Sequence, residues 1–449
     1  MVTSGRALTE IDKTVRVTEV IDAAPLSRYQ WRVALLCVLV GVIDGFENGV
    51  VAYVAPALAA DLSIAVPALG QVFAAGTLGM ACGTMILGSV GDLWGRKRAV
   101  LLSVLVFGVA ALATAAAQTI GELMLWRFVA GIAIGGAQPV MVALLSEYAP
   151  ARHRSAAMVF GFVGTGTGVP TSALLSAVLV PEYGWQVVFV IGGVVPLLLL
   201  PWLMVVFPES IRYQVNRGPG SAPQVAHTLN RIVGGSRYSP ADRFELQEPP
   251  AARGSVMALL SPPYRGATLA IWSVYCSNWV AWYLFLLWLP TALTEAGLPD
   301  ARAALVGAGM GVTALLVMIP AAVVVQRAGA RRAMLWLFGL GVLLAAALVA
   351  AGTRWWLVII LVMPFTICIV IPQVALNYLC VQLYPTSIRA TGVSWAVSAG
   401  RIGSILGAFG GGSVIAGFGL AGFFAAVGLP LILAGLLVVL AFRRERTGP

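Results

Sequence analysis

Residues 33–58 read "VALLCVLVGVIDGFENGVVAYVAPAL", a run with only two charged side chains, Asp44 and Glu47. A helix crosses about 30 Å of hydrocarbon with roughly 20 apolar residues, so this run is long enough to span a bilayer. The composition of the whole chain agrees: of 449 residues, 59% are hydrophobic and 10% are charged, and the mean hydropathy is +0.92. The chain has too few polar groups to cover a soluble surface and belongs in a membrane.

Runs of similar length recur along the sequence and predict an all-α membrane protein with twelve transmembrane helices in two six-helix halves. The predicted spans are 33–58, 69–90, 97–117, 122–145, 155–179, 186–207, 266–290, 303–325, 333–351, 355–381, 391–416 and 419–441. A polar stretch rich in Pro, Gly and charged residues separates the halves. It predicts a surface linker with one short helix near "VAHTLNRIV", residues 225–233.

The chain is therefore expected to have five parts. They are a cytoplasmic N-terminal segment (1–32), an N-terminal six-helix bundle (33–207), a cytoplasmic linker (208–265), a C-terminal six-helix bundle (266–441) and a cytoplasmic tail (442–449). The first segment carries charges of both signs and no apolar core, unlike a cleavable signal peptide, so the first span is expected to be retained.

Positive charges predict the orientation, because Lys and Arg are enriched in the cytoplasmic loops of membrane proteins. With the N-terminus in the cytoplasm, nearly all of the 28 Lys and Arg residues fall on that side, and only Arg302 and Arg354 fall on the other. We therefore expect a multi-pass protein of the inner (plasma) membrane with both termini cytoplasmic. Topology explains the net charge of +10, so no nucleic-acid partner is expected.

The residues that carry most enzyme chemistry are sparse. The five cysteines lie within or at the ends of spans, without metal-ligand or paired-disulfide spacing, and the two histidines, His153 and His227, lie in cytoplasmic segments. The sequence contains no Ser/His/Asp triad, P-loop or metal-ligand cluster. It predicts neither an enzyme, nor an ATP-driven pump, nor a metal or cofactor site.

Asp44 and Glu47 are the two acids of 18 that lie at membrane depth. At i and i+3 they project from nearly the same face of a helix. An ionised carboxylate at the centre of a span costs at least about 2.5 kcal/mol, so it normally faces a partner or a watery cavity. Two interpretations remain open: a structural ion pair between helices, or a proton or substrate site. In the same span Gly41, Gly45 and Gly49 predict the close approach of a neighbouring helix.

Two arginines also lie within spans. Arg127 opens the fourth span and is the expected partner of the span-one acids, with Arg401 in "SAGRIGSILGAFGGG" (398–412) as the alternative. A guanidinium offers a planar fork of donors that matches a carboxylate. One arginine can therefore hold the acid of span one while the other holds an anionic substrate. Arg401 could instead contact backbone carbonyls of a broken helix.

The loop between spans two and three, "GSVGDLWGRKR" (88–98), resembles the loop signature of the major facilitator superfamily. "RFVAGIAIGGAQPVMVALLSEYAPARHR" (127–154), followed by "PES" (208–210), resembles the repeated helix-end motifs of that superfamily. The resemblance implies that this region locks the cytoplasmic side shut in one state, with gating residues Gly91, Asp92, Gly95, Arg96, Glu147 and Arg152. The corresponding loop of the second half, "QRAGARRAM" (326–334), carries Gln326 and Ala330 where an acid and a glycine are expected, so that lock is weakened.

Three further stretches are similar to the aromatic acid:proton symporters. They are "DGFE" (44–47), "WSVYCSNWVAWYLFLLWLPTAL" (272–293) and "LYPTSIRATGVSWAVSAGRIGSILG" (383–407). The similarity runs over nearly the whole chain outside the linker. In that family the first stretch usually reads Asp-Gly-Phe-Asp. Here the second acid is Glu47, whose side chain is one methylene longer than that of aspartate. The resemblance implies proton coupling and substrate transport by Asp44 and Glu47.

These observations predict a proton-coupled secondary transporter that imports a small organic anion, an aromatic carboxylate such as a (hydroxy)benzoate, by alternating access. Arg127 is assigned to both proton coupling and substrate binding. Arg401, Trp279, Trp282 and Tyr283 are assigned to substrate binding, although Trp and Tyr near span ends are also common as interfacial anchors. The expected partners are the anion, protons and the lipid bilayer, and the chain is expected to function as a monomer.

Two rival functions use the same sequence features. A proton-driven efflux antiporter would share the scaffold, and "GFVGTGTGVPTSA" (161–173) faintly resembles an exporter signature, although its Gly-Pro order is absent. A non-transporting membrane sensor would bind ligand without flux, and the lack of a sizeable soluble region argues against it.

Overall fold

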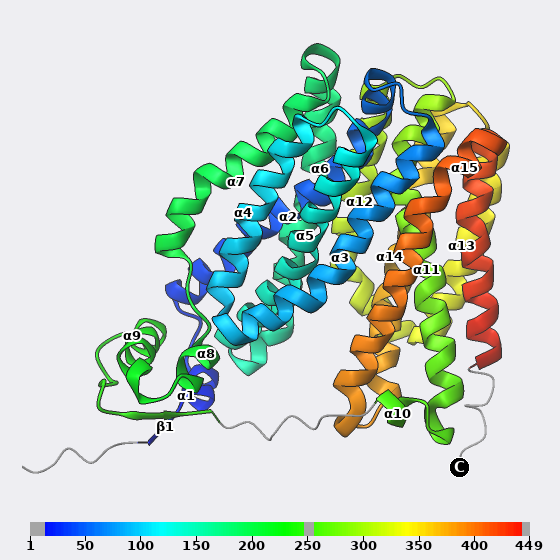
Figure 1. Cartoon of the computed structure of the whole chain (residues 1–449). Helices are drawn as coiled ribbons and strands as arrows, with labels where there is room; N and C mark the ends of the chain where they lie inside the picture. Colours follow the sequence, from blue (N-terminus) through cyan, green and yellow to red (C-terminus); the bar gives the residue numbers. More distant parts are fainter. Residues whose placement is uncertain (1–13, 247–255, 442–449) are drawn as a thin grey trace, which may run out of the picture.

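The computed structural model describes residues 14–246 and 256–441, which are almost entirely helical (Figure 1). The elements in chain order are β1 (Thr14–Arg16), α1 (Val17–Ala23), α2 (Arg28–Asp61), α3 (Val66–Trp94), α4 (Arg96–Ala115), α5 (Ile120–Tyr148), η1 (Ala151–His153), α6 (Arg154–Tyr183), α7 (Gln186–Val206), α8 (Ile211–Asn216), η2 (Pro219–Ser221), α9 (Ala222–Val233), β2 (Arg243–Glu245), α10 (Val256–Leu259), α11 (Pro262–Glu295), α12 (Asp300–Ala328), α13 (Ala330–Ala351), α14 (Trp355–Leu383) and α15 (Thr386–Ala441).

Within the described residues, eleven helices are long and apolar enough to cross a membrane. The last of them, α15, has a non-helical backbone at Gly419, where φ is 61° and ψ is −158°. Figure 1 shows that α15 turns back on itself there, as an orange arm followed by a red arm. A φ in this region favours glycine, which has no Cβ to clash. α15 therefore accounts for the last two predicted spans, and ten other helices account for the rest.

Several helices begin before the predicted spans, and at α2 a polar cap extends the helix beyond the apolar run. α2 begins at Arg28, where the Ser27 hydroxyl accepts from the Gln30 backbone N–H and the Gln30 side chain accepts from the Ser27 backbone N–H. This reciprocal capping box satisfies two N–H groups that a helix start otherwise leaves open. The predicted start at residue 33 was therefore late. The predicted start at residue 266 was also late, because α11 begins at Pro262.

Helices α2 to α7 form the N-terminal half, and α11 to α15 form the C-terminal half beside it (Figure 1). The end where α2 passes into α3 is called the far end, and the end where α3 passes into α4 is called the linker end. At the far end Phe73 packs edge-on against Trp288, with ring centroids 4.8 Å apart, and the Tyr53 hydroxyl donates to the Gly307 carbonyl at 3.5 Å. In Figure 1, α3 and α15 approach each other at the far end and diverge toward the linker end.

Glycines allow the helices of the N-terminal half to approach closely. A Cβ at Gly45 of α2 would lie 2.1 Å from the Thr165 carbonyl oxygen of α6, and one at Gly168 of α6 would lie 2.2 Å from the Val42 carbonyl oxygen. The stripe of Gly41, Gly45 and Gly49 therefore does face a neighbouring helix, and that neighbour is α6. Such small-residue contacts stabilise helix pairs in membranes, where burial of apolar surface supplies little driving force.

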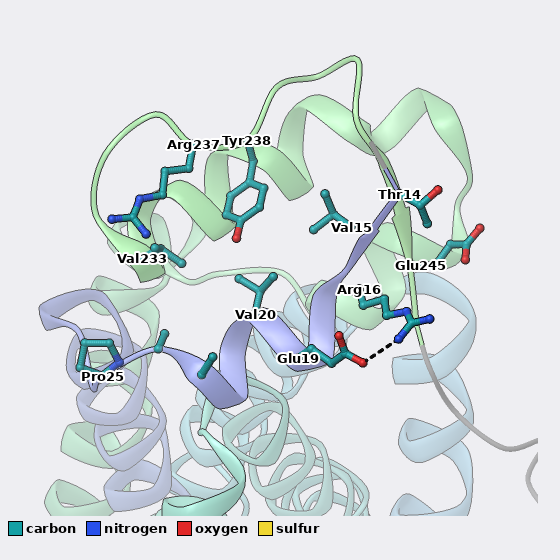
Figure 2. Close-up of a pocket in the computed structure, with 12 residues that line it drawn as sticks. Thr14, Val15, Arg16, Glu19, Val20, Pro25, Val233, Arg237, Tyr238 and Glu245 are labelled. Carbon is teal, nitrogen blue, oxygen red and sulfur yellow. Dashed lines mark hydrogen bonds and ion pairs between the residues drawn. The ribbon is translucent and has the colours of Figure 1, made fainter. Parts of the chain in front are cut away.

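The N-terminal segment and the linker fold together at the linker end. β1 pairs in parallel with β2, and α1 buries Val17 and Ile21 among residues of α9 and neighbouring elements. An open hollow of about 890 Å³ lies between these elements, and Figure 2 shows the side chains that line it. The predicted linker helix is α9, but α8, η2, α10 and β2 were not predicted. Parts of these segments (1–13 and 247–255) and the predicted tail (442–449) lie outside the described residues.

This unit is attached to the N-terminal half. The Ala151 backbone N–H donates to Asp22 at 2.7 Å, and an Arg152 N–H donates to the Ala24 carbonyl at 2.9 Å. The Arg231 guanidinium lies over the Tyr29 ring, 4.1 Å from its centroid. The N-terminal segment and the part of the linker up to β2 therefore form one body with this half.

We predict that Gly45→Ala destabilises the protein, because the new methyl group would collide with the α6 backbone. Overpacking of this kind costs roughly 1–3 kcal/mol. The matched control is Gly339→Ala in α13, where no atom lies within 4 Å of the new Cβ. Thermal unfolding in detergent should show a lower midpoint for Gly45→Ala only, and equal midpoints for the two variants would contradict the packing argument.

Candidate functional site

The two acids of α2 are buried and face different partners. Asp44 is 2% exposed and Glu47 is 1% exposed. The Thr165 hydroxyl of α6 donates to Asp44 Oδ2 at 3.3 Å, whereas Asp44 Oδ1 has no hydrogen-bond partner among the described residues. Glu47 Oε2 accepts from both terminal nitrogens of Arg127 at 3.4 Å. The two carboxylates thus share a helix but have separate environments.

Arg127 is held inside the N-terminal half by three contacts. Besides its pair with Glu47, it donates from Nη2 to the Thr114 hydroxyl of α4 at 2.9 Å, and its guanidinium lies 4.7 Å from the Phe189 ring centroid of α7. The side chain is 3% exposed. The ion-pair distance of 3.4 Å exceeds the 2.7–2.9 Å typical of charge-assisted hydrogen bonds. The Glu47–Arg127 ion pair is therefore buried, but its hydrogen bonds are long.

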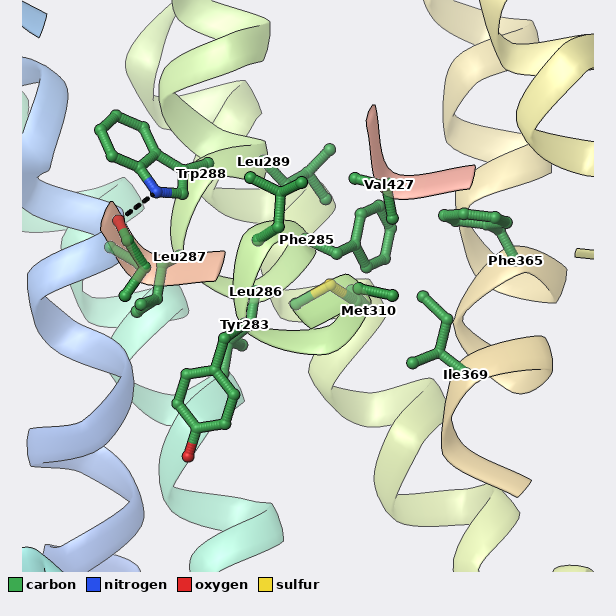
Figure 3. Packing of buried hydrophobic residues seen from close by; sticks show 14 of the residues in the cluster. Tyr283, Phe285, Leu286, Leu287, Trp288, Leu289, Met310, Phe365, Ile369 and Val427 are labelled. Atoms are coloured by element: carbon green, nitrogen blue, oxygen red, sulfur yellow. Dashed lines mark hydrogen bonds between the residues drawn. The ribbon is translucent and has the colours of Figure 1, made fainter. Parts of the chain in front are cut away.

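A small cavity of about 30 Å³ joins this ion pair to the C-terminal half. Its lining includes Glu47 and Arg127 from the N-terminal half and Tyr283 and Leu287 from α11. A volume of this size accommodates a water molecule and is far below the 300–1,000 Å³ of typical small-molecule sites. In Figure 3 the Tyr283 hydroxyl points away from the apolar cluster that holds Phe285 and Trp288.

Arg401 of α15 lies in a polar and aromatic group of the C-terminal half. Its guanidinium lies over the Trp279 ring, 5.1 Å from the centroid, and the Tyr283 side chain lies near it. Its charge also acts on Asp44 across the interface between the halves. The alternative of a broken helix at Arg401 does not hold, because α15 departs from helical geometry at Gly419 instead.

The structure separates the three predicted aromatic residues. Trp279 and Tyr283 are neighbours, with ring centroids 5.9 Å apart, and Arg401 lies over the Trp279 ring. Trp282 makes no ring or cation contact with this group within the described part of the chain and, like Trp279, packs against the large apolar cluster. Trp279 lies in the middle of α11, which runs from Pro262 to Glu295, so it is not an interfacial anchor at a span end.

The predicted gating residues divide into a connected set and a separate set. Arg96 pairs with Glu147 at 2.8 Å, and the Ser210 hydroxyl donates to Glu147 at 2.6 Å. Gly95, with φ of 99°, packs so closely that a Cβ would meet the Glu209 carboxylate, while Gly91 faces Val140.

Asp92 and Arg152 do not join this set. Asp92 is exposed at the linker end of α3 and forms no ion pair within the described part of the chain. Arg152 donates to the N-terminal segment instead.

A sequence model of the Major Facilitator Superfamily matches residues 37–408. The chain belongs to the major facilitator superfamily. Members of this superfamily are transporters and not enzymes, in agreement with the sequence prediction. The described helices, with their apolar spans, accordingly form a multi-pass membrane protein.

Curated relatives within the superfamily extend over nearly the whole chain. A gallate transporter of Pseudomonas putida is 36% identical, over 96% of this chain and 95% of the relative. The 4-hydroxybenzoate transporter PcaK of Pseudomonas putida is 34% identical, over 92% of both chains. These relatives match the resemblance to aromatic acid:proton symporters.

Solved structures show the same fold at lower identity. The inward open conformation of the xylose transporter XylE from E. coli aligns with a TM-score of 0.73 at 18% identity, covering 93% of this chain and 98% of that one. A bacterial homologue of the lysosomal transporter Spinster, in an inward-facing conformation, aligns with a TM-score of 0.73 at 17% identity, covering 94% of this chain and 99% of that one. The major facilitator fold is therefore confirmed.

Sequence reasoning missed the neutral residues that complete the site of this superfamily member. Thr114, Thr165 and Phe189 contact the charged groups, yet single Thr and Phe residues are common in apolar spans and carry no recognisable spacing. The sequence could have identified Asn278 and Gln373, because polar amide side chains stand out within apolar spans.

We predict that Arg127→Gln destabilises the protein more than Glu47→Gln does. Removing the arginine leaves a buried carboxylate unpaired, a change that costs roughly 3–5 kcal/mol, whereas Gln at position 47 keeps an oxygen that can accept from Arg127. The double variant should unfold at a higher temperature than Arg127→Gln alone. Thermal unfolding of the three proteins tests this, and simple additivity of the two single effects would argue against the ion pair.

Proposed function

We propose that this protein is a proton-coupled secondary transporter that imports a small aromatic carboxylate, such as a (hydroxy)benzoate, by alternating access. The observation that carries the proposal is the group formed by Arg401, Trp279 and Tyr283, which faces the buried Asp44 across the interface of the halves. Relatives named for gallate, 4-hydroxybenzoate and benzoate support the substrate class. Substrate sites between the halves are the rule in this type of transporter.

In the proposed binding mode, the substrate carboxylate pairs with Arg401 and the aromatic ring packs against Trp279 and Tyr283. A guanidinium binds a carboxylate through two parallel hydrogen bonds, and the buried Nε of Arg401 has no hydrogen-bond partner within the described part of the chain. Aromatic rings gain further stability from offset or edge-on contacts. The proposed binding mode needs no residue from a second copy, and we propose that the protein functions as a monomer.

In the proposed coupling step, the substrate and Asp44 compete for the charge of Arg401. A buried carboxylate without a nearby cation is costly in its ionised form. When the substrate carboxylate occupies Arg401, Asp44 takes up a proton, and the anion and proton then cross together. Glu47, enclosed with Arg127, connects to the same interface through the small cavity, so we assign it to the proton path.

For gating, we propose that the linker end is cytoplasmic, as the distribution of Lys and Arg predicts. The far end, where the halves meet through Phe73 and Trp288, is then the closed outer gate, and the state is inward-facing. Arg96 and Glu147, with Gly91 and Gly95, hold the α3–α4 loop within the N-terminal half. Asp92 is free to meet the C-terminal half when the linker end closes. Arg152 acts on the N-terminal segment.

Uptake into proteoliposomes tests the proposal. With an alkaline interior, the protein should accumulate radiolabelled benzoate and 4-hydroxybenzoate, and should accumulate neither nicotinate nor sugars to the same extent. Loss of preloaded substrate against an inward proton flux would indicate an efflux antiporter. Binding without flux would indicate a sensor, and accumulation of sugars alone would refute the substrate class.

We predict that Asp44→Asn and Glu47→Gln abolish accumulation driven by a pH gradient, because neither variant can bind and release the coupling proton at that position. Exchange of labelled for unlabelled substrate at equal pH should persist in Asp44→Asn, since exchange needs no net proton movement. Accumulation at the wild-type level in both variants would eliminate the assigned coupling role.

We also predict that Arg401→Lys raises the apparent Michaelis constant for benzoate by roughly tenfold, because lysine keeps the charge but loses the bidentate fork. Arg401→Ala should remove saturable binding. An uncharged analogue such as benzamide should be affected much less. Unaltered benzoate affinity in Arg401→Ala would place the anion elsewhere, with Arg127 as the next candidate.

A further inference from the structure

Two amide side chains adjoin the proposed substrate group and have no role so far. Asn278 lies on α11 beside Trp279, and Gln373 lies on α14. The Trp279 indole N–H donates to Gln373 Oε1 at 2.7 Å, and Asn278 Nδ2 donates to the same oxygen at 3.2 Å. The amides thus form a connected pair next to the ring over which Arg401 lies.

Trp279 determines the orientation of the Gln373 amide. An indole N–H can only donate, so the Gln373 atom that it meets must be the acceptor oxygen. The NH₂ group of Gln373 then points away from Trp279 and Asn278, and Gln373 is half-buried and not sealed in the core. Gln373 therefore offers donors on the side that its oxygen does not occupy.

Asn278 supplies an acceptor that lacks a partner. Its side chain is 1% exposed, and its Oδ1 has no hydrogen-bond partner among the described residues. A buried polar atom without a partner is uncommon in folded proteins and calls for an explanation, such as a group that binds there. Because Asn278 Nδ2 is already bound to Gln373, the orientation of the Asn278 amide is consistent with a free oxygen.

We propose that Asn278 and Gln373 form a subsite for a hydroxyl group on the aromatic ring of the substrate. This proposal rests on the proposed function, because it assumes a substrate whose carboxylate pairs with Arg401 and whose ring packs against Trp279. A phenolic hydroxyl donates one hydrogen bond and accepts others, so it can donate to Asn278 Oδ1 and accept from Gln373 Nε2. A second carboxylate would only accept and would leave Asn278 Oδ1 unpaired.

The subsite makes the protein selective for hydroxylated aromatic acids over benzoate. Benzoate would leave the buried Asn278 oxygen without a partner, as it is without substrate, whereas a hydroxylated acid satisfies it. A site built to bind a substrate hydroxyl discriminates strongly against the analogue that lacks it. Arg401 binds the carboxylate, Trp279 packs against the ring, and the two amides bind the hydroxyl.

The test compares Asn278→Leu with wild type for benzoate, 3-hydroxybenzoate, 4-hydroxybenzoate and gallate in proteoliposomes. Leucine removes the acceptor, while Gln373 Oε1 keeps its bond from Trp279. We expect KM for the preferred hydroxylated acid to rise about tenfold, the effect of one good hydrogen bond, and KM for benzoate to stay within twofold of wild type. Retained benzoate uptake also demonstrates that the variant is folded.

Asn278→Ala is a second variant with less bulk, and Ser277→Ala is the matched control. Ser277 is a neighbouring buried polar residue of α11 outside the amide pair. The ratio of the hydroxylated-acid KM to the benzoate KM should change in both Asn278 variants and not in Ser277→Ala. Equal effects on both substrates in the Asn278 variants, or no effect, would overturn the subsite. Failure of the wild type to transport any aromatic acid would instead refute the proposed function.

Discussion

The burial of two carboxylates in one apolar helix is the constraint on which the rest of this structure depends. Lipid cannot solvate Asp44 or Glu47, so the protein must provide every partner that they have. Glu47 obtains its partner from α5 of the same half, in a pocket closed by Thr114 and Phe189. Asp44 receives one hydrogen bond from Thr165, and the arginine that acts on it belongs to the other half.

The two acids therefore differ in where their arginines lie: Arg127 is in the same half as Glu47, whereas Arg401 is in the other half from Asp44. In the alternating access that we propose, relative motion of the halves would leave the contacts of Glu47 with Arg127 intact, because α2 and α5 belong to the same bundle. The same proposed motion would change the distance between Asp44 and Arg401, so the cost of the Asp44 charge would depend on the state of the protein. A charge whose environment changes with conformation is what a proton-coupled transporter requires.

Helices pack closely both within the N-terminal half and between the halves. Within the N-terminal half, α2 and α6 approach through Gly45 and Gly168 to backbone contact. Between the halves, α3 likewise approaches the backbone of α15 at Gly70, and the far end also holds the contacts of Phe73 with Trp288 and of Tyr53 with Gly307. Within the described residues, the folded N-terminal segment and the linker as far as β2 pack on the N-terminal half and do not bridge it to the C-terminal half.

The sequence by itself determined the membrane class, the positions of the spans, the glycine stripe and the membrane-depth charges, because apolar length and buried charge leave direct marks on composition. It also identified Arg127 and Arg401 as the arginines in question. Only the tertiary structure decided that Glu47 pairs with Arg127 and that Arg401 lies over Trp279. Only it revealed that β1 pairs with β2 and that the Asn278 and Gln373 amides meet beside Trp279. These contacts join residues far apart in the chain, and the direction of a side chain around a uniformly apolar helix is set by packing against neighbours that local sequence does not specify.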